Sequence, residues 1–135
     1  MKIVVCGSMI AYPKMLKLKS KLEQNGHVVI LPDPAKDKHI KLIKENKYVD
    51  TYKLKIKFDY IRRHYRNILS ADCILITNWS KNNEKNYIGG NAFLEMGFAH
   101  ILKKPIYTLK PIPNNRYYYH EMRAMKPQIF PLPHR

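Results

Sequence analysis

NYIGGNAFLEMGFA, residues 86–99, joins a glycine turn to the start of a predicted helix, and the rest of the chain is interpreted around it. Glycine tolerates positive φ and lets the backbone approach a ligand closely, so Gly89 and Gly90 are expected to form such a turn. Asn91 is expected to cap the helix, and the amides after it would face outward at the positive helix end. These three residues are therefore predicted to contact a substrate.

Glu95 is the only charged residue between Ala92 and Ala99, about one turn into this predicted helix. It follows an apolar strand, Cys73–Thr77, and a polar loop, so it is expected near the carboxyl end of a parallel sheet, where such sheets place their sites. An acidic residue near a helix start often only complements the macrodipole. A lone acid in apolar surroundings, however, is either partnered or functional, which makes Glu95 the candidate catalytic carboxylate.

The length of 135 residues allows one hydrophobic core but not two, so a single domain spanning 1–135 is predicted. No apolar span is long enough for a membrane helix, and the first residues lack the apolar core and cleavage site of a signal peptide. A cytoplasmic protein without a membrane partner is therefore expected. Cys6 and Cys73 fall at opposite ends of two predicted parallel strands, about 10 Å or more apart, so both are expected to be reduced and buried.

The net charge of +15 comes from 19 lysines and 6 arginines against 10 acidic residues. Such a charge suits a polyanionic partner or a phosphorylated substrate. The lysines, however, are scattered over predicted solvent-facing positions, whereas fixed phosphate recognition favours arginine. A nucleic-acid partner is therefore not expected.

The chain begins with a predicted βαβ unit. The apolar run Lys2–Cys6 predicts a buried strand, the spacing of apolar residues predicts a helix over Pro13–Asn25, and His27–Leu31 predicts a second strand. Asn25 and Gly26 are typical of a helix end.

The loop between the first strand and the first helix faces the side where a phosphate or sugar would bind. Gly7, Ser8 and Met9 are predicted to contact the substrate there. Because this loop has one glycine, it lacks the G-x-G-x-x-G fingerprint, and a nicotinamide cofactor site is rejected. No cofactor is expected.

Residues 35–57 contain many lysines and few strongly apolar side chains. Three interpretations stay open for this segment: a lid, a partner contact or a flexible insertion. The helix predicted after it, Phe58–Leu69, has an apolar stripe. The stripe consists of Ile61, Tyr65, Ile68 and Leu69. His64 lies outside it, and a lone helical histidine is more often a surface or satisfied residue than a functional one.

The third predicted strand, Cys73–Thr77, is followed by Asn78 at the edge of the sheet that carries the site, so Asn78 is predicted to contact the substrate. Asp72 lies at the opposite end and is expected to be structural, in a turn. Ile106–Leu109 predicts a fourth parallel strand, and the tyrosine-rich tail could add a fifth strand or reach across a subunit boundary. No Cys/His set has zinc-like spacing, so no metal site is expected.

The order and spacing of these motifs resemble the nucleoside 2-deoxyribosyltransferase-like superfamily, which includes the nucleoside 5′-monophosphate N-glycosidases. The matching segments are Cys6–Ser8, Gly26–Val29, Ser70–Ile76, Gly90–Ala99 and Lys104–Ile106. The resemblance implies a flavodoxin-like or Rossmann-like three-layer sandwich with a mostly parallel sheet of four to five strands. It also implies a small-molecule nucleoside or nucleotide as partner and a homodimer or larger assembly.

The resemblance further implies that Glu95 attacks the anomeric carbon and forms a glycosyl-enzyme intermediate, which water or a second base then resolves. Members commonly carry a second acid where this chain has His64, so His64 is hypothesised to protonate or contact the leaving base. The strand-one tyrosine and the arginine of the monophosphate hydrolases are replaced by Val4 and Ile10, and Tyr12 could substitute for the tyrosine. The alternative is a nucleotide-binding module of the same fold without turnover.

Overall fold

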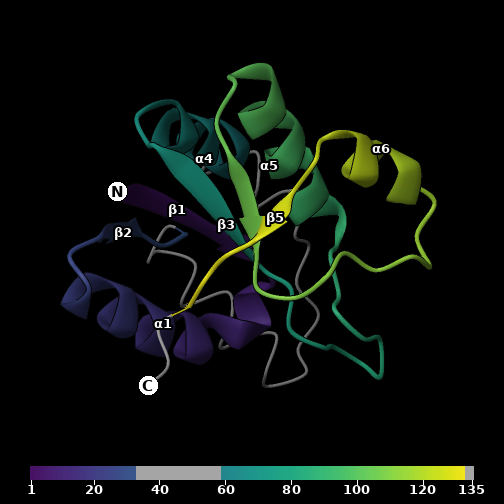
Figure 1. Ribbon diagram of the computed structural model, residues 1–135, viewed down its shortest axis with the longest axis horizontal. Helices are drawn as coiled ribbons and strands as arrows, with labels where there is room; N and C mark the ends of the chain where they lie inside the picture. Colours follow the sequence, from purple (N-terminus) through teal and green to yellow (C-terminus); the bar gives the residue numbers. More distant parts are fainter. Residues whose placement is uncertain (33–58, 133–135) are drawn as a thin grey trace.

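Five strands form one sheet in the order β2-β1-β3-β4-β5, and every pairing between them is parallel (Figure 1). The computed structural model describes residues 1–32 and 59–132, so the predicted insertion at 35–57 lies outside the described residues. The strands are β1 (Lys2–Gly7), β2 (Val28–Ile30), β3 (Cys73–Thr77), β4 (Ile106–Thr108) and β5 (Gln128–Ile129). The prediction of an α/β fold with four to five parallel strands is confirmed, and the tail supplies the fifth.

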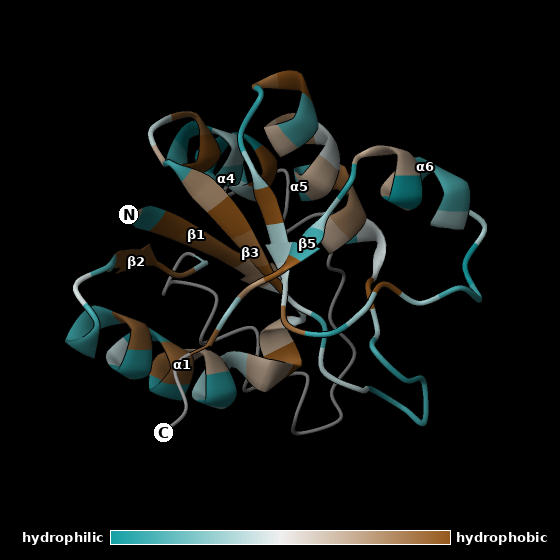
Figure 2. Cartoon of the chain, viewed as in Figure 1, coloured by the Kyte–Doolittle hydropathy of each residue, from teal (hydrophilic) through white to brown (hydrophobic). Residues whose placement is uncertain are grey.

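Helices cover both faces of the sheet, which makes a three-layer sandwich (Figure 1). The helices are η1 (Met9–Ala11), α1 (Tyr12–Gln24), α4 (Tyr60–Leu69), α5 (Gly90–Ile101) and α6 (Tyr119–Ala124). The apolar side chains of β1 alternate between the two faces, as a strand requires. Ile3 and Val5 join the core under α1, whereas Val4 and Cys6 join the core under α4 and α5. The central strands are strongly hydrophobic because both of their faces are buried (Figure 2).

Helices α1 and α4 differ in how well the sequence predicted them. Helix α1 ends before Gly26, whose φ of 87° only glycine adopts easily, as predicted. In α4 the predicted stripe was right for Ile68, which is fully buried, and wrong for Ile61 and Leu69, which are about half exposed. The buried residues of α4 are Tyr60, His64 and Ile68. They recur every four residues along one helix face, so the histidine belongs to the buried side.

Both cysteines are buried and neither forms a disulfide, as predicted. The register pairs Ile3 with Cys73 and Cys6 with Ile76, so the thiols lie three residue steps, about 10 Å, apart along the strands. Burial, reinforced by the charge of Asp72, raises the pKa of the Cys73 thiol to about 11. Asp72 is structural as predicted, but it accepts a 2.7 Å hydrogen bond from the Lys2 amide at the start of β1 rather than capping its own turn.

No helix within residues 1–32 and 59–132 is long and apolar enough to cross a bilayer.

The carboxyl ends of β1 and β3 approach each other closely at Gly7 and Thr77, which are paired in the sheet. A β-carbon at Gly7 would lie 2.1 Å from Thr77 Oγ1 and 3.2 Å from the Thr77 carbonyl oxygen. The Thr77 hydroxyl is held in place because it donates a 3.2 Å hydrogen bond to the Cys6 carbonyl. The packing of β1 against β3 therefore requires glycine at position 7, independently of the substrate contact predicted for this residue.

Replacing Gly7 with alanine should destabilise the fold by about 1–3 kcal/mol, because the new methyl group must displace the Thr77 side chain. Urea unfolding followed by circular dichroism measures this loss. The matched control is Gly90→Ala, since a β-carbon at Gly90 has no described atom within 4 Å. That variant should keep or slightly raise the free energy of unfolding, and equal stability of both variants would contradict the packing role of Gly7.

Candidate active site

Helix α5 begins at Gly90, and its N-cap lies two residues before the predicted cap, Asn91. Gly89 is its N-cap, with extended backbone at φ −88° and ψ −177°, and its carbonyl accepts the first helical bond from the Phe93 amide. The predictions of positive φ at Gly89 and Gly90 and of an Asn91 cap were therefore wrong. Left-handed φ occurs instead in the preceding polar loop, at Asn82, Asn83 and Asn86. Asparagine tolerates this region because its short side chain bonds locally.

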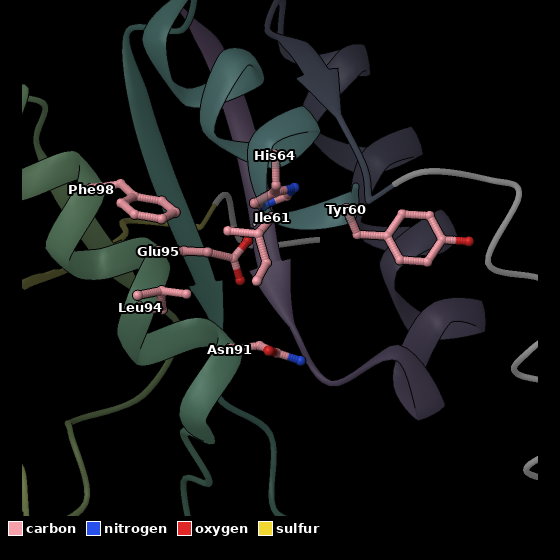
Figure 3. A pocket seen from close by; sticks show the side chains of 7 residues that line it. All are labelled: Tyr60, Ile61, His64, Asn91, Leu94, Glu95 and Phe98. Carbon is pink, nitrogen blue, oxygen red and sulfur yellow. Dashed lines mark ion pairs between the residues drawn. The ribbon is translucent and has the colours of Figure 1, made fainter. Parts of the chain in front are cut away.

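Glu95 consequently lies in the second turn of α5, and no acidic residue occupies the first turn. The helix macrodipole acts mainly on the first and last turns, so it does not account for this carboxylate. The Glu95 side chain is only 13% exposed and contacts His64, whose side chain is 8% exposed. Glu95 Oε2 and His64 Nε2 form an ion pair between α5 and α4, and the two side chains point toward each other (Figure 3).

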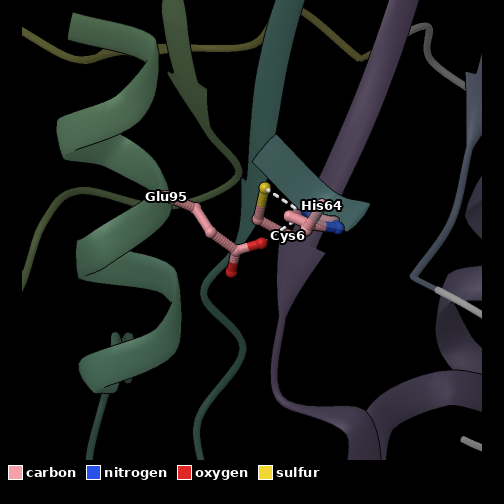
Figure 4. A group of neighbouring side chains, drawn as sticks. All are labelled: Cys6, His64 and Glu95. Carbon is pink, nitrogen blue, oxygen red and sulfur yellow. Dashed lines mark hydrogen bonds and ion pairs between the residues drawn. The ribbon is translucent and has the colours of Figure 1, made fainter. Parts of the chain in front are cut away.

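Cys6 completes this group from the end of β1. Its Sγ lies 3.2 Å from His64 Nε2, and the thiol sulfur, the imidazole nitrogen and a carboxylate oxygen of Glu95 all lie within 4.8 Å of one another (Figure 4). The three residues come from three elements that are far apart in the sequence. Their meeting point is at the carboxyl end of the sheet next to β1 and β3, where the strand order reverses and where doubly wound folds bind ligands.

A pocket opens beside this group between α4 and α5 (Figure 3). Together with the open space at its mouth it comprises about 360 Å³. Its lining consists of Tyr60, Ile61, His64, Asn91, Leu94, Glu95 and Phe98. Of the predicted site residues, the structure thus brings together Glu95, His64 and Asn91.

The remaining predicted residues lie outside this lining. Tyr12 packs in the core under α1, on the sheet face opposite to the one that carries Glu95. Met9 packs against the same core as Tyr12. Ser8 precedes η1, and Gly7 packs on Thr77. Their roles, and those of Gly89 and Gly90, stay predictions.

Asn78 is fully buried and uses its side-chain amide to hold the backbone after β4. Its Nδ2 donates to the carbonyls of Lys110 (2.8 Å) and Pro111 (3.2 Å), and its Oδ1 accepts from the amides of Leu109 (3.1 Å) and Lys110 (2.9 Å). These four contacts occupy the amide, so the structure gives Asn78 a scaffold role in place of the predicted substrate contact.

The segment before α6 holds the start of α5. Tyr118 donates a 2.6 Å hydrogen bond to the Ile88 carbonyl, and its ring stacks on Phe93 at a centroid distance of 4.3 Å. Burial raises the pKa of the Tyr118 hydroxyl, which keeps it protonated as a donor. Tyr117, by contrast, is fully exposed.

Cys6 and the apolar pocket residues were missed by the sequence-based analysis. One available signal was the period-2 alternation of β1, which puts Cys6 on the same face as Val4 and therefore under α4 and α5. Phe98 lies three residues after Glu95 and four after Leu94, and both spacings indicate a shared helix face.

A parallel sheet of order 2-1-3-4-5 with helices on both faces defines a flavodoxin-like α/β protein. Neither a protein-family model nor a curated protein matches this sequence. Among solved structures, the chain is similar to a 2-deoxyribosyltransferase from Bacillus psychrosaccharolyticus, with a TM-score of 0.58 and 16% identity, covering 93% of this chain and 82% of that one. It is also similar to the CMP N-glycosidase BcmB of Clostridium botulinum, with a TM-score of 0.50 and 17% identity, covering 96% and 88%. The fold is therefore the one that the resemblance to the nucleoside 2-deoxyribosyltransferase-like superfamily implied.

Replacing Asn78 with alanine should lower the free energy of unfolding by about 2–4 kcal/mol, because several buried backbone groups lose their partners. Thermal and urea unfolding measure the change. Asn25→Ala is the matched control, since Asn25 donates one exposed hydrogen bond to the Lys21 carbonyl and should cost about 0.5 kcal/mol or less. A fully stable Asn78→Ala protein would contradict the scaffold role.

Proposed function

We propose that this protein cleaves or transfers the N-glycosidic bond of a nucleoside or nucleotide, with Glu95 as the nucleophile. The observation that carries the proposal is the nearly buried Glu95 carboxylate that lines a pocket at the switch point of the sheet. A carboxylate there is poorly hydrated, which makes it a better nucleophile and a stronger partner for positive charge than one in bulk water. The two solved structures, named for deoxyribosyl transfer and for CMP N-glycosidase activity, support the same class of reaction.

The reaction requires two bond changes at the anomeric carbon. A Glu95 oxygen forms a bond to this carbon while the bond to the base nitrogen breaks, and the electron pair of that bond leaves with the base. The base takes up a proton, and the sugar stays on Glu95 as an ester. Water then releases the sugar in a hydrolase, or a second base takes it in a transferase.

His64 is better suited to hold Glu95 than to protonate the leaving base. In retaining glycosidases the two groups that flank the scissile bond stand about 5–5.5 Å apart, because the sugar lies between them. His64 Nε2 instead contacts Glu95 Oε2 directly, which leaves no room for a sugar carbon between them. We therefore propose His64 as a positioning residue that orients the carboxylate toward the pocket.

The rest of the lining suits a nucleoside. Ile61, Leu94 and Phe98 offer apolar surface to the flat face of a base, whereas Asn91 offers an amide to a sugar hydroxyl. The chain's high positive charge would favour a phosphorylated substrate.

A nucleotide-binding module without turnover is the second candidate. It is favoured by one observation: the Glu95 carboxylate is already paired with His64 and has to be shared with, or released to, an incoming sugar. A binding module keeps that pair intact when the ligand is bound.

Replacing Glu95 with glutamine should lower the rate of base release by roughly three orders of magnitude or more, because the amide cannot attack the sugar. The measurement is chromatography of free base after incubation with a panel of nucleosides and their 5′-monophosphates. Mass spectrometry of the wild-type protein should in addition find a pentosyl adduct on Glu95.

Glu23→Gln serves as the matched control, since Glu23 is exposed on α1 and should leave turnover unchanged. If the wild-type protein binds a nucleotide in equilibrium dialysis but releases no base from any member of the panel, the enzymatic proposal is wrong and the binding module is favoured.

Replacing His64 with alanine should lower kcat by about 10- to 100-fold for every substrate, because the carboxylate loses its orientation. The informative comparison is between an ordinary purine nucleoside and its N7-methylated form, whose cationic base leaves without taking up a proton. A positioning residue affects both substrates equally. A general acid would affect only the ordinary nucleoside, and that result would restore the role hypothesised from the sequence.

A further inference from the structure

The reaction proposed above uses Glu95 and its partner His64 but gives no task to the buried thiol of Cys6. This thiol lies at the same point, 3.2 Å from His64 Nε2 and in the group whose sulfur, nitrogen and oxygen atoms lie within 4.8 Å of one another (Figure 4). The three side chains approach from β1, α4 and α5, which are regular elements packed against one another. Donor atoms held on such elements keep their positions well.

Two polar atoms lie against His64 Nε2, the Glu95 carboxylate oxygen and the Cys6 sulfur. A thiol sulfur accepts as well as donates, so a protonated Nε2 can face both atoms. A cation held by the three residues would take the place of that proton, because sulfur, nitrogen and oxygen would then all direct lone pairs at the same centre.

We propose that Cys6, His64 and Glu95 form a binding site for Zn²⁺. Thiolate and imidazole ligands favour zinc over magnesium and calcium, which prefer all-oxygen sites. Tetrahedral bonds of about 2.0–2.3 Å place ligand atoms about 3.3–3.7 Å apart. The 3.2 Å between the Cys6 sulfur and His64 Nε2 is close to this spacing, whereas the Glu95 oxygen contacts His64 Nε2 directly and has to move away from it before a metal ion fits between them. All three donor atoms already lie within 4.8 Å of one another.

Binding releases a proton from the Cys6 thiol to the solvent and leaves thiolate, neutral imidazole and carboxylate on the metal. Three protein ligands leave the fourth tetrahedral position open, as in zinc sites that accept an outside ligand. Glu95 and His64 both line the pocket, so a water molecule or a polar group of a small molecule could occupy that position from the pocket side.

Zinc and substrate would exclude each other at this site. The metal takes a carboxylate oxygen of Glu95, which the attack on the sugar requires. This consequence rests on the proposed function, whereas metal binding itself does not. Free Zn²⁺ should therefore inhibit base release in competition with the nucleoside, and a chelator should restore it.

Cobalt titration of the full-length protein tests the site without any assay of activity. Co²⁺ bound by a thiolate gives a charge-transfer absorption that histidine and carboxylate sites elsewhere on the chain do not produce. The expected result is this band at one Co²⁺ per protein, displaced by one equivalent of Zn²⁺. Cys6→Ala should lose the band. Cys73→Ala is the matched control, since Cys73 is equally buried but lies at the other end of the strands, and it should keep the band.

A second variant keeps the test informative if Cys6→Ala does not fold. Glu95→Gln retains the thiolate and should show the band with an affinity at least about 10-fold weaker, since one of the three ligands is weakened. Absence of the band in the wild-type protein, or its loss in Cys73→Ala, would overturn the zinc site. Base release without metal binding would disprove only the zinc site, and metal binding without base release would disprove only the enzymatic proposal.

Discussion

The close approach of β1 and β3 at their carboxyl ends is the constraint on which the site depends. Gly7 has no side chain, so Thr77 fits against it and can bond to the Cys6 carbonyl. This contact fixes the carboxyl ends of β1 and β3 at the point where the strand order reverses. Helices α4 and α5 pack on the same face, and their polar residues His64 and Glu95 meet over the end of β1. The pocket lies beside this meeting point and is lined by residues of α4 and α5.

Much of the fold could be predicted because local signals agreed with the global arrangement. The bounds of β3 were predicted correctly, since Cys73–Thr77 is an apolar run buried on both faces. The end of α1 was predicted at Gly26, where positive φ requires glycine. The conformation predicted for Gly89 and Gly90 was wrong, because a helix N-cap and first turn accept negative φ in any residue, whereas asparagines supply the left-handed conformations. Periodicity cannot reveal which glycine is needed for backbone shape and which is merely tolerated.

The candidate site was predicted in part. Glu95 stood out because it is a single charge in an apolar segment. His64 became a candidate only through the family resemblance, because its partners come from β1 and α5, 58 and 31 positions away, and no local pattern shows them. Asn78 shows the opposite error. A polar residue at the carboxyl edge of a sheet was taken for a ligand contact, but the loop after β4 also needs hydrogen bonds there, and its backbone groups use the whole amide. The loops at the carboxyl edge of the sheet need polar side chains for their own hydrogen bonds, so a polar residue there does not by itself indicate a ligand contact.

The outer strands of the sheet are short, with three residues in β2 and two in β5. Each presents an exposed apolar side chain, Val28 in β2 and Ile129 in β5. Long, flat borders with apolar side chains invite another chain to add a strand and start aggregation. Here each border offers too few unpaired backbone groups for a stable intermolecular ladder. The short outer strands thus limit edge-to-edge aggregation of the sheet, and they complement the mutual repulsion of chains that carry a net charge of +15.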